Sequence, residues 1–241
     1  MTYCVGLLLK AGMVLLSDTR TNAGLDNIAT YRKMFTFEDP GERVITILTA
    51  GSLSVTQTTI AKLRDAVEDP ESTENTSIMK APTMLKVASI IGDMLSSVRL
   101  TVDEKLNAMG QGANASMIVA GQRAGGEMRM FLVYSEGNFI EATEDTPFLQ
   151  IGEHKYGKPI LDRVVKPDTS LADARKAMLL SMDSTLRSNL SVGMPLDLAI
   201  IVKDECRVSS LQRIEDQDPD FQAMSAAWSN ALRDAFQTIE I

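Results

Sequence analysis

Hydrophobic residues dominate four short segments at the start of the chain, and turn-forming residues separate these segments. The four segments are residues 3–9, 13–17, 32–37 and 44–49. The turn at residues 10–12 predicts that the first two form a β-hairpin, and residues 39–41 predict a similar turn between the last two. Because the first hairpin is apolar on both faces, we expect its sheet to be covered on both sides.

Longer segments with apolar residues at helical spacing alternate with further strand-like segments. Helices are predicted at residues 54–69, 82–106, 156–165 and 170–187, and again at the C-terminus. Strands are predicted at residues 116–121, 128–134, 138–142, 148–151, 196–203 and 206–211. Ser54 is the expected N-cap of the first helix. The C-terminal helix carries an apolar stripe that we expect in the core or at a subunit contact, formed by Phe221, Met224, Trp228, Leu232 and Phe236.

The order of these elements indicates the fold class. Four strands, two helices, four strands, two helices, two strands and one helix follow one another. This grouping favours an α+β fold, a four-layer α/β/β/α sandwich of two antiparallel sheets flanked by helices. No repeat, low-complexity tract or change in composition marks a boundary, so we expect a single domain over residues 1–241.

Charge and composition exclude several classes of function. The chain has 24 Lys and Arg against 32 Asp and Glu, a formal net charge of −8. We expect no nucleic-acid partner, because such proteins usually carry a basic surface, and no membrane partner, because no apolar segment could span a bilayer. Without a signal-peptide pattern, and with only Cys4 and Cys206, we expect a reduced, cytoplasmic protein. A single histidine, His154, leaves too few ligands for a zinc site, so neither a metal nor a cofactor is predicted.

The single histidine also limits the choice of a general base. A free α-amino group, with a pKa near ~7.7–8.0, is another candidate at neutral pH. Methionine before a small residue is normally trimmed, and removal of Met1 would leave Thr2 with a free amine beside its own hydroxyl. That amine can take the hydroxyl proton and make the oxygen a nucleophile. A Met-Thr start alone carries little information, because many proteins have one.

The predicted hairpin places charged residues near Thr2. If residue i lies opposite roughly 21 − i to 23 − i, Thr2 faces residues 19–21, beside Asp18. Lys33 begins the next predicted strand, and its ammonium at the same place would favour deprotonation of a nearby hydroxyl and amine. A structural interpretation also exists for each: Asp18 as a turn former or a partner of Arg20, and Lys33 as a solvated side chain.

Gly51 is a candidate for stabilising negative charge. It lies where a predicted strand ends and a predicted helix begins. Backbone N–H groups at such a place, assisted by the helix N-terminus, can hold an oxyanion. An ordinary strand-to-helix turn is the structural alternative.

Together these segments resemble a proteasome-type β subunit, which belongs to the N-terminal nucleophile hydrolases. The matching segments are residues 2–6, residues 17–20 with Gly24, then Lys33, Ala50-Gly51, residues 150–152 and residues 188–193. The details are most similar to the bacterial proteasome-related proteins called Anbu, for ancestral beta subunit. The similarity covers most of the chain, and the first fifty residues are specific in combination rather than singly.

The resemblance implies a reaction and a role for each candidate residue. Thr2, exposed as the first residue, would be the nucleophile of a threonine peptidase, and its amine would be the proton acceptor. Asp18 would orient Lys33, whose charge lowers the pKa of the nucleophile. The Gly51 N–H would stabilise the oxyanion, and the peptide bond would be hydrolysed through an acyl-enzyme ester.

The resemblance implies supporting residues as well, and here the chain departs from the family. Ser191 would support the N-terminal amine, with Arg20 and Ser188 as further supporting residues. Ser188 stands where an aspartate is usual, with Asn189 as the nearest substitute, and Glu153 stands where a serine is usual. The loop before Lys33 is one residue shorter than is typical.

Three functions remain open at this point. The resemblance implies a homo-oligomer, either a ring or an open helical stack, that admits peptides or unfolded proteins, with any ATPase partner unspecified. A non-catalytic proteasome-like scaffold is the first alternative, because the supporting residues are altered. A small-molecule amidase of the same superfamily is the second alternative.

Overall fold

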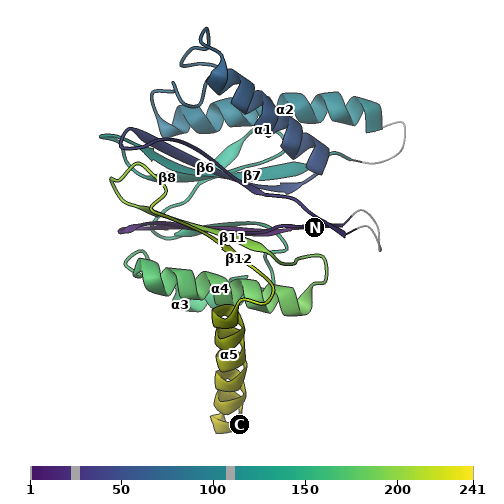
Figure 1. Cartoon of the computed structure of the whole chain (residues 1–241), viewed down its shortest axis with the longest axis vertical. Coiled ribbons are helices and arrows are strands. Elements are labelled where there is room, and N and C mark those ends of the chain that lie inside the picture. Colours follow the sequence, from purple (N-terminus) through teal and green to yellow (C-terminus); the bar gives the residue numbers. More distant parts are fainter. Residues whose placement is uncertain (1, 23–27, 107–111, 241) are drawn as a thin grey trace.

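The chain folds into two antiparallel sheets packed face to face between two layers of helices (Figure 1). The computed structural model describes residues 2–22, 28–106 and 112–240, so Met1 and Gly24 lie outside the described residues. Helices α1 (Leu53–Glu68) and α2 (Met84–Leu106) cover one sheet, and α3 (Lys158–Val164) and α4 (Leu171–Ser188) cover the other. The predicted α/β/β/α sandwich is confirmed.

Each sheet has five strands within the described ranges. The first sheet contains, in spatial order, β10 (Phe148–Gly152), β1 (Tyr3–Leu9), β2 (Gly12–Asp18), β11 (Leu196–Val202) and β12 (Ser210–Ile214). The second contains β5 (Met34–Asp39), β6 (Arg43–Gly51), β7 (Ala115–Arg123), β8 (Arg129–Val133) and β9 (Phe139–Glu141). A small separate sheet pairs β3 (Arg20–Asn22) with β4 (Ile28–Thr30).

Alternate residues of the hairpin β1–β2 pack into different layers, which explains why the hairpin is apolar on both faces. Val5, Leu16 and the other residues on the same face of the hairpin contact the core under α3 and α4. Cys4 and Leu15, on the opposite face, lie in the core between the sheets. Cys4 pairs with Ser17, so residue i lies opposite residue 21 − i, at one limit of the predicted register. The hairpin therefore supplies two inner strands of a doubly covered sheet.

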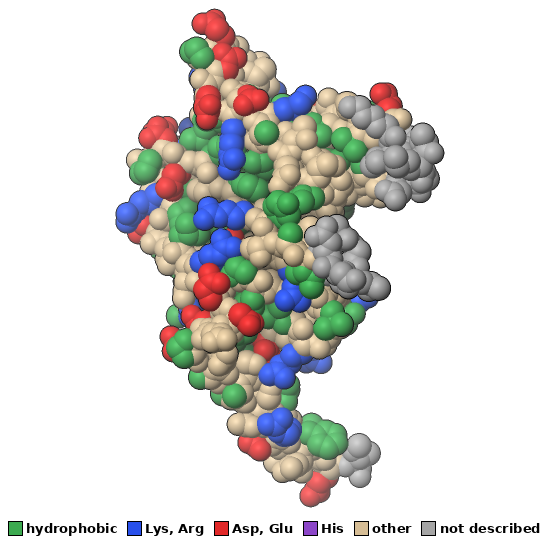
Figure 2. Space-filling model, turned by 45° about the vertical axis from the view of Figure 1, so that its right-hand side comes forward, with side chains coloured by type: hydrophobic (Ala, Val, Ile, Leu, Met, Phe, Trp, Pro, Cys, Tyr) green, Lys and Arg blue, Asp and Glu red, His purple; other side chains and the backbone are tan. Residues whose placement is uncertain are grey.

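Helix α5 (Pro219–Thr238) begins on the body of the protein and then extends away from it (Figure 1). Its N-cap is Asp218, whose side chain accepts a hydrogen bond of 2.9 Å from the Phe221 N–H. Phe221 is buried and Met224 packs against the core, but Leu232 is 51% exposed and Phe236 is 80% exposed. The apolar stripe is therefore divided between the core and an exposed apolar face, which Figure 2 shows on the projecting end of the helix.

The structure differs from the sequence-based prediction in several elements. The short strands β3 and β4 were not predicted, because three-residue strands carry too few positions for an alternating pattern. The last strand begins at Ser210 rather than at residue 206, since Cys206 has a φ of +47° and belongs to a turn. The N-cap of α1 is Ser52 instead of Ser54, and α3 begins at Lys158 instead of residue 156. No helix within the described ranges is long and apolar enough to cross a membrane.

Both cysteines are expected to be inert in the folded protein. Cys4 is fully buried and Cys206 is 1% exposed, and burial raises the pKa of both thiols above the ordinary value. Because only the thiolate reacts, a disulfide reagent at pH 8 should react at least about a hundredfold more slowly with native than with unfolded protein. Release of a chromophoric thiolate measures both rates, and rapid reaction of the native protein would contradict the burial of these thiols.

Candidate active site

Thr2 lies at the start of β1, held between the neighbouring strands of its sheet. It is only 6% exposed, and its carbonyl oxygen accepts a hydrogen bond of 2.7 Å from the Glu153 N–H, directly after β10. Gly152, the last residue of β10, has a φ of +81°, and a Cβ there would overlap the Thr2 carbonyl oxygen. The site thus requires glycine at position 152 both for its backbone conformation and for the close approach of two strands.

Asp18 ends β2 and joins three parts of the chain. Its side chain is fully buried, and its Oδ1 accepts hydrogen bonds from Lys33 Nζ at 2.8 Å and from the Tyr3 N–H at 3.1 Å. Its Oδ2 accepts a hydrogen bond of 3.2 Å from the Gly193 N–H, in the loop before β11. Burial raises the pKa of the Asp18 carboxyl, and the Lys33 charge and the hydrogen bonds oppose that effect. The carboxylate is therefore a buried anchor for Lys33.

Lys33 lies between β4 and β5 and is fixed at both ends. Its Nζ donates to Asp18 Oδ1 and also to the Arg20 carbonyl oxygen at 2.5 Å. Its own carbonyl oxygen accepts a hydrogen bond of 2.9 Å from the Thr49 N–H of β6. Lys33 is 4% exposed, so the ammonium is shielded from bulk water. The structure thus brings Asp18 and Lys33 together at the end of the hairpin where Thr2 lies.

Gly51 ends β6, immediately before Ser52 at the N-terminus of α1. Its φ is +100°, and a Cβ at this position would overlap the Asn114 carbonyl oxygen. Gly51 and Gly152 line a common cavity of about 360 Å³, together with residues that follow β8, including Ser135. The ends of β6 and β10 line the cavity; Gly152 is the lining residue that contacts Thr2, and Thr2 itself is not among the lining residues.

The supporting residues gather around the loop between α4 and β11: Ser191 lies in the loop, Ser188 ends α4 and Arg20 begins β3. Ser191 Oγ donates a hydrogen bond of 2.5 Å to Asn189 Oδ1, and the Ser191 N–H donates to the same oxygen at 3.0 Å. Arg20 Nη1 donates to the Leu190 carbonyl oxygen at 3.1 Å, so Arg20 fastens this loop to β3. Ser188 is the exposed last residue of α4. The side chain that contacts Ser191 is thus Asn189.

Sequence reasoning gave no role to a second polar group under β1. The Tyr3 hydroxyl lies 2.6 Å from Ser181 Oγ of α4 and accepts a hydrogen bond of 2.6 Å from Gln150 Nε2 of β10. Burial raises the pKa of Tyr3 to about 12, so the phenol stays neutral and links the strand to the helix layer. Tyr3 follows Thr2 in sequence, but nothing in the apolar pattern distinguishes it from an ordinary core residue.

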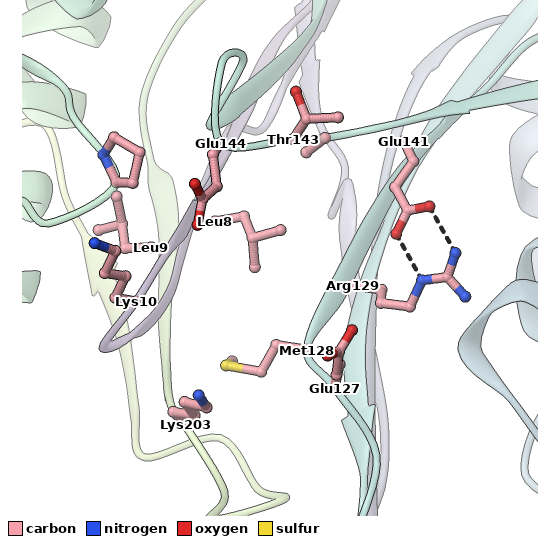
Figure 3. Close-up of a pocket in the computed structure, with 12 residues that line it drawn as sticks. Leu8, Leu9, Lys10, Glu127, Met128, Arg129, Glu141, Thr143, Glu144 and Lys203 are labelled. Atoms are coloured by element: carbon pink, nitrogen blue, oxygen red, sulfur yellow. Dashed lines mark hydrogen bonds and ion pairs between the residues drawn. The ribbon is translucent and has the colours of Figure 1, made fainter.

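A second cavity, of about 350 Å³, lies at the opposite end of β1 (Figure 3). Leu8, Met128 and Lys10 line it, beside an Arg129–Glu141 pair with two hydrogen bonds of 2.6 Å. Leu8 and Lys10 are at the turn end of the hairpin, whereas Thr2 is at its open end, so this cavity is separate from the candidate site. Within the described part of the chain, no group of His, Cys, Asp and Glu side chains is arranged to hold a metal ion.

Comparison with known proteins identifies the family. Residues 2–201 match the proteasome subunit family, and no curated protein matches the chain. A solved mutant of Anbu from Hyphomicrobium sp. strain MC1 is 48% identical, with 100% of this chain and 99% of that chain covered and a TM-score of 0.93. Anbu from Yersinia bercovieri is 41% identical, with 99% and 98% covered and a TM-score of 0.91.

A third similar structure is described as the helical assembly of the Anbu complex from Pseudomonas aeruginosa. It is 41% identical, with 99% of this chain and 97% of that chain covered and a TM-score of 0.93. These matches extend over whole chains, and the family match includes all the candidate site residues from Thr2 to Ser191. These similarities agree with the sandwich and with the site at the open end of the β1–β2 hairpin. The chain therefore belongs to the proteasome subunit family, with Anbu proteins, the ancestral beta subunits, among its relatives.

Proposed function

We propose that this chain is a threonine-type peptidase of one hydrolase domain, residues 1–241, with Thr2 as its N-terminal nucleophile. The observation that carries the proposal is the buried Lys33–Asp18 ion pair at the strand end where Thr2 lies. A lysine fixed in this place supplies a positive charge that favours the ionised hydroxyl and the neutral amine of an N-terminal threonine. The similar structures show which family the chain belongs to but not which reaction it catalyses. The proposed peptidase activity therefore rests on this geometry.

The proposed reaction uses the α-amine of Thr2 as the base, once Met1 has been removed. The amine takes the proton from Oγ1, directly or through a water, and Oγ1 attacks the carbonyl carbon of a peptide bond. The Gly51 N–H stabilises the resulting oxyanion. The amine then returns the proton to the leaving nitrogen, and a water hydrolyses the ester to release the second product. Ser191, held by Asn189, supports the amine.

Labelling of Thr2 is the experiment that tests this proposal. Protein purified from cells is expected to lack Met1 by intact mass, and a β-lactone is expected to form one ester at Thr2. Thr2→Ala should abolish both the adduct and peptide cleavage, whereas Thr19→Ala, the same change at a buried threonine between β2 and β3, should leave the labelled position unchanged. Protein that lacks Met1 but forms no adduct and cleaves no peptide would contradict the proposal.

A non-catalytic scaffold is the second candidate function, favoured by a specific observation. The neutral Asn189 side chain, rather than a carboxylate, accepts the two hydrogen bonds from Ser191. A neutral amide provides less support for a protonated amine during the reaction than an aspartate does. Full rescue of a deletion phenotype by Thr2→Ala would select the scaffold, and cleavage of N-acyl amides without cleavage of peptides would select a small-molecule amidase.

We also propose that the chain acts in the cytoplasm as a homo-oligomer, a ring or an open helical stack, on peptides or unfolded proteins. The relative from Pseudomonas aeruginosa is described as a helical assembly. In this chain, the projecting end of α5 has an apolar side that includes Leu232 and Phe236. A projecting helix of this length gains most of its stability from packing on its apolar side, so a second copy is a suitable occupant.

Phe236→Asp is expected to weaken the assembly. Burying a new carboxylate in an apolar contact is unfavourable, so the apparent dissociation constant should rise at least about a hundredfold. Mass photometry across a dilution series measures the distribution of oligomers. Gln237→Asp is the matched control, because it adds the same charge to the exposed neighbouring position. Unchanged assembly in Phe236→Asp would exclude this side of α5 as a contact.

A further inference from the structure

The peptide group between Thr2 and Tyr3 is held on both of its sides. Its carbonyl oxygen, which belongs to Thr2, accepts the hydrogen bond of 2.7 Å from the Glu153 N–H. Its N–H, which belongs to Tyr3, donates the hydrogen bond of 3.1 Å to Asp18 Oδ1. The same oxygen of Asp18 accepts a hydrogen bond from Lys33 Nζ at 2.8 Å. One carboxylate oxygen therefore relates the direction of this peptide group to the position of the Lys33 ammonium.

This peptide group restrains Thr2 more than it would restrain an internal residue. A peptide group is planar and holds the Cα atoms at both of its ends, so an internal residue is restrained from two sides. Once Met1 is removed, as the proposed reaction requires, Thr2 has a peptide bond on the Tyr3 side alone. The placement of Tyr3 therefore sets the covalent restraint on the Thr2 hydroxyl and amine.

The Tyr3 side chain is anchored at its far end. Tyr3 is fully buried, and it packs in the core under α3 and α4. Its hydroxyl lies 2.6 Å from Ser181 Oγ, which is buried on α4, and accepts a hydrogen bond of 2.6 Å from Gln150 Nε2 on β10. Displacing a buried hydroxyl with two partners is costly, because polar atoms are then left unpaired away from water. The phenol therefore fixes where β1 begins.

The segment that bonds to Thr2 also packs against this hydroxyl. The segment runs from Glu153 to Gly157, the N-cap of α3. A Cβ on Gly157 would overlap Ser181 Oγ and would lie 2.8 Å from the Tyr3 hydroxyl oxygen. Gly157 thus packs directly on the two hydroxyls, while the N–H of Glu153 bonds to the Thr2 carbonyl oxygen. Both ends of the segment are tied to the start of β1.

We infer that Tyr3 is a positioning residue for Thr2, and that its hydroxyl acts through the hydrogen bonds with Gln150 and Ser181. Burial raises the pKa of Tyr3 to about 12, so the hydroxyl is neutral and supplies direction rather than charge. The consequence for the reaction rests on the proposed function. The placement of the peptide group after Thr2 does not.

Tyr3→Phe tests the role in the reaction, because it keeps the ring and removes only the hydroxyl. Labelling of Thr2 by a β-lactone at pH 7 should be about tenfold slower, in the rate of bond formation rather than in reversible binding of the probe. The midpoint of the pH profile should move upward, toward ~8, because the amine moves away from the Lys33 charge. Intact mass checks that both proteins lack Met1. A wild-type rate with a wild-type midpoint would overturn the contribution to the reaction.

Tyr156→Phe is the matched control, since it removes the same hydroxyl from the segment between Glu153 and Gly157. Tyr156 is half-buried, and the Lys155 ammonium lies 5.2 Å from the centroid of its ring. Within the described ranges the Tyr156 hydroxyl forms no hydrogen bond. Its removal should therefore leave the labelling rate and the midpoint unchanged.

Ser181→Ala keeps the inference testable if Tyr3→Phe fails to fold. Alanine is the better helix former, so α4 should tolerate the change. The Tyr3 hydroxyl loses one of its two partners, so labelling of Thr2 should slow about threefold, with the same upward movement of the midpoint. If Tyr3→Phe does not fold, wild-type labelling of Ser181→Ala would overturn the contribution to the reaction.

Hydrogen exchange tests the positioning without reference to the reaction. In Tyr3→Phe and in Ser181→Ala, the amides of residue 3 and Glu153 should exchange about tenfold faster, while the amides of β6 and β7 in the other sheet stay unchanged. Unchanged exchange at both amides would overturn the inference. A wild-type protein that is never labelled would overturn the proposed function, and the exchange result would still decide the positioning role of Tyr3.

Discussion

Lys33→Met is expected to destabilise the protein by about 3–5 kcal/mol at neutral pH. The substitution removes the cation from a fully buried Asp18, which keeps only the hydrogen bonds from the Tyr3 and Gly193 amides. An uncompensated buried charge has a cost of this size. Urea denaturation measures the change. Lys176→Met is the matched control, because its Asp173 partner lies at a similar distance, 2.9 Å, but both side chains are more than 60% exposed, so its effect should be below about 0.5 kcal/mol.

The loss of stability in Lys33→Met should also depend on pH, in a direction that the pKa of Asp18 sets. Burial already raises the pKa of Asp18, and removal of Lys33 takes away the largest opposing effect, so the pKa rises further. A carboxyl whose pKa is higher in the folded than in the unfolded state destabilises the fold wherever it is ionised. The deficit of Lys33→Met should therefore be largest at neutral pH and shrink as the pH falls toward about 4, the unfolded value. A deficit that grows on acidification would contradict this account.

The same substitution should remove the reactivity of Thr2. Without the fixed ammonium, the amine and the hydroxyl lose the charge that favours their deprotonated forms, and labelling by a β-lactone should fall by about 10²–10⁴-fold. The comparison must be made on folded protein, at a temperature well below the transition of the variant. Labelling at the wild-type rate would show that Lys33 has only a structural role.

Gly152→Ala is expected to displace Thr2, the proposed nucleophile. A Cβ at this position would overlap the carbonyl oxygen and carbon of Thr2, and both are backbone atoms that cannot rotate away. The strand must move, so the hydrogen bond between the Glu153 N–H and the Thr2 carbonyl oxygen is lost. A displacement near 1 Å reduces a reaction by about 10²-fold, and the labelling rate should fall by at least that factor.

The control for Gly152→Ala is Gly41→Ala. Gly41 has a similar φ, +87°, but no atom lies within 4 Å of a Cβ placed there. Its substitution should therefore have only the conformational cost, about 1–2 kcal/mol, with labelling of Thr2 unchanged. In thermal denaturation, Gly152→Ala should lose more stability than Gly41→Ala does. Equal losses of stability would mean that the backbone near Thr2 accommodates the added Cβ without further cost.

Much of the fold could be predicted because its strands and helices are long enough to show a period. The position of one turn was enough to predict the pairing register of β1 and β2 to within two residues. A hairpin that is apolar on both faces was enough to predict a sheet covered on both sides. Cys206 shows the limit of this reasoning. The segment after it alternates like a strand, but the turn at Asp204 and Cys206, both with positive φ, moves the strand to Ser210. A positive φ at a residue other than glycine has little signature in sequence.

The candidate site was predictable only where its residues are close in sequence or match a known family. Thr2 and Asp18 are joined by one hairpin, so their proximity followed from the register. The sequence offered both Ser188 and Asn189 in place of the usual aspartate. It could not choose between them, because the choice depends on where α4 ends, and helix ends are set by local packing. The hydrogen bond from the Gly193 N–H to Asp18 could not be predicted either, because it depends on a pairing of β2 with β11 that spans most of the chain.

The position of β1 in its sheet has a consequence during synthesis. Cys4 can pair with Ser17 as soon as the first hairpin leaves the ribosome, but its other partner, Ile151, is made more than 130 residues after Ser17. At ~5–20 residues per second, roughly 7–30 s separate the two events. During this time one edge of β1 is open. If Met1 is removed, as the proposed reaction requires, pairing with β10 then closes over Thr2, so the order of translation would give that removal a kinetic window.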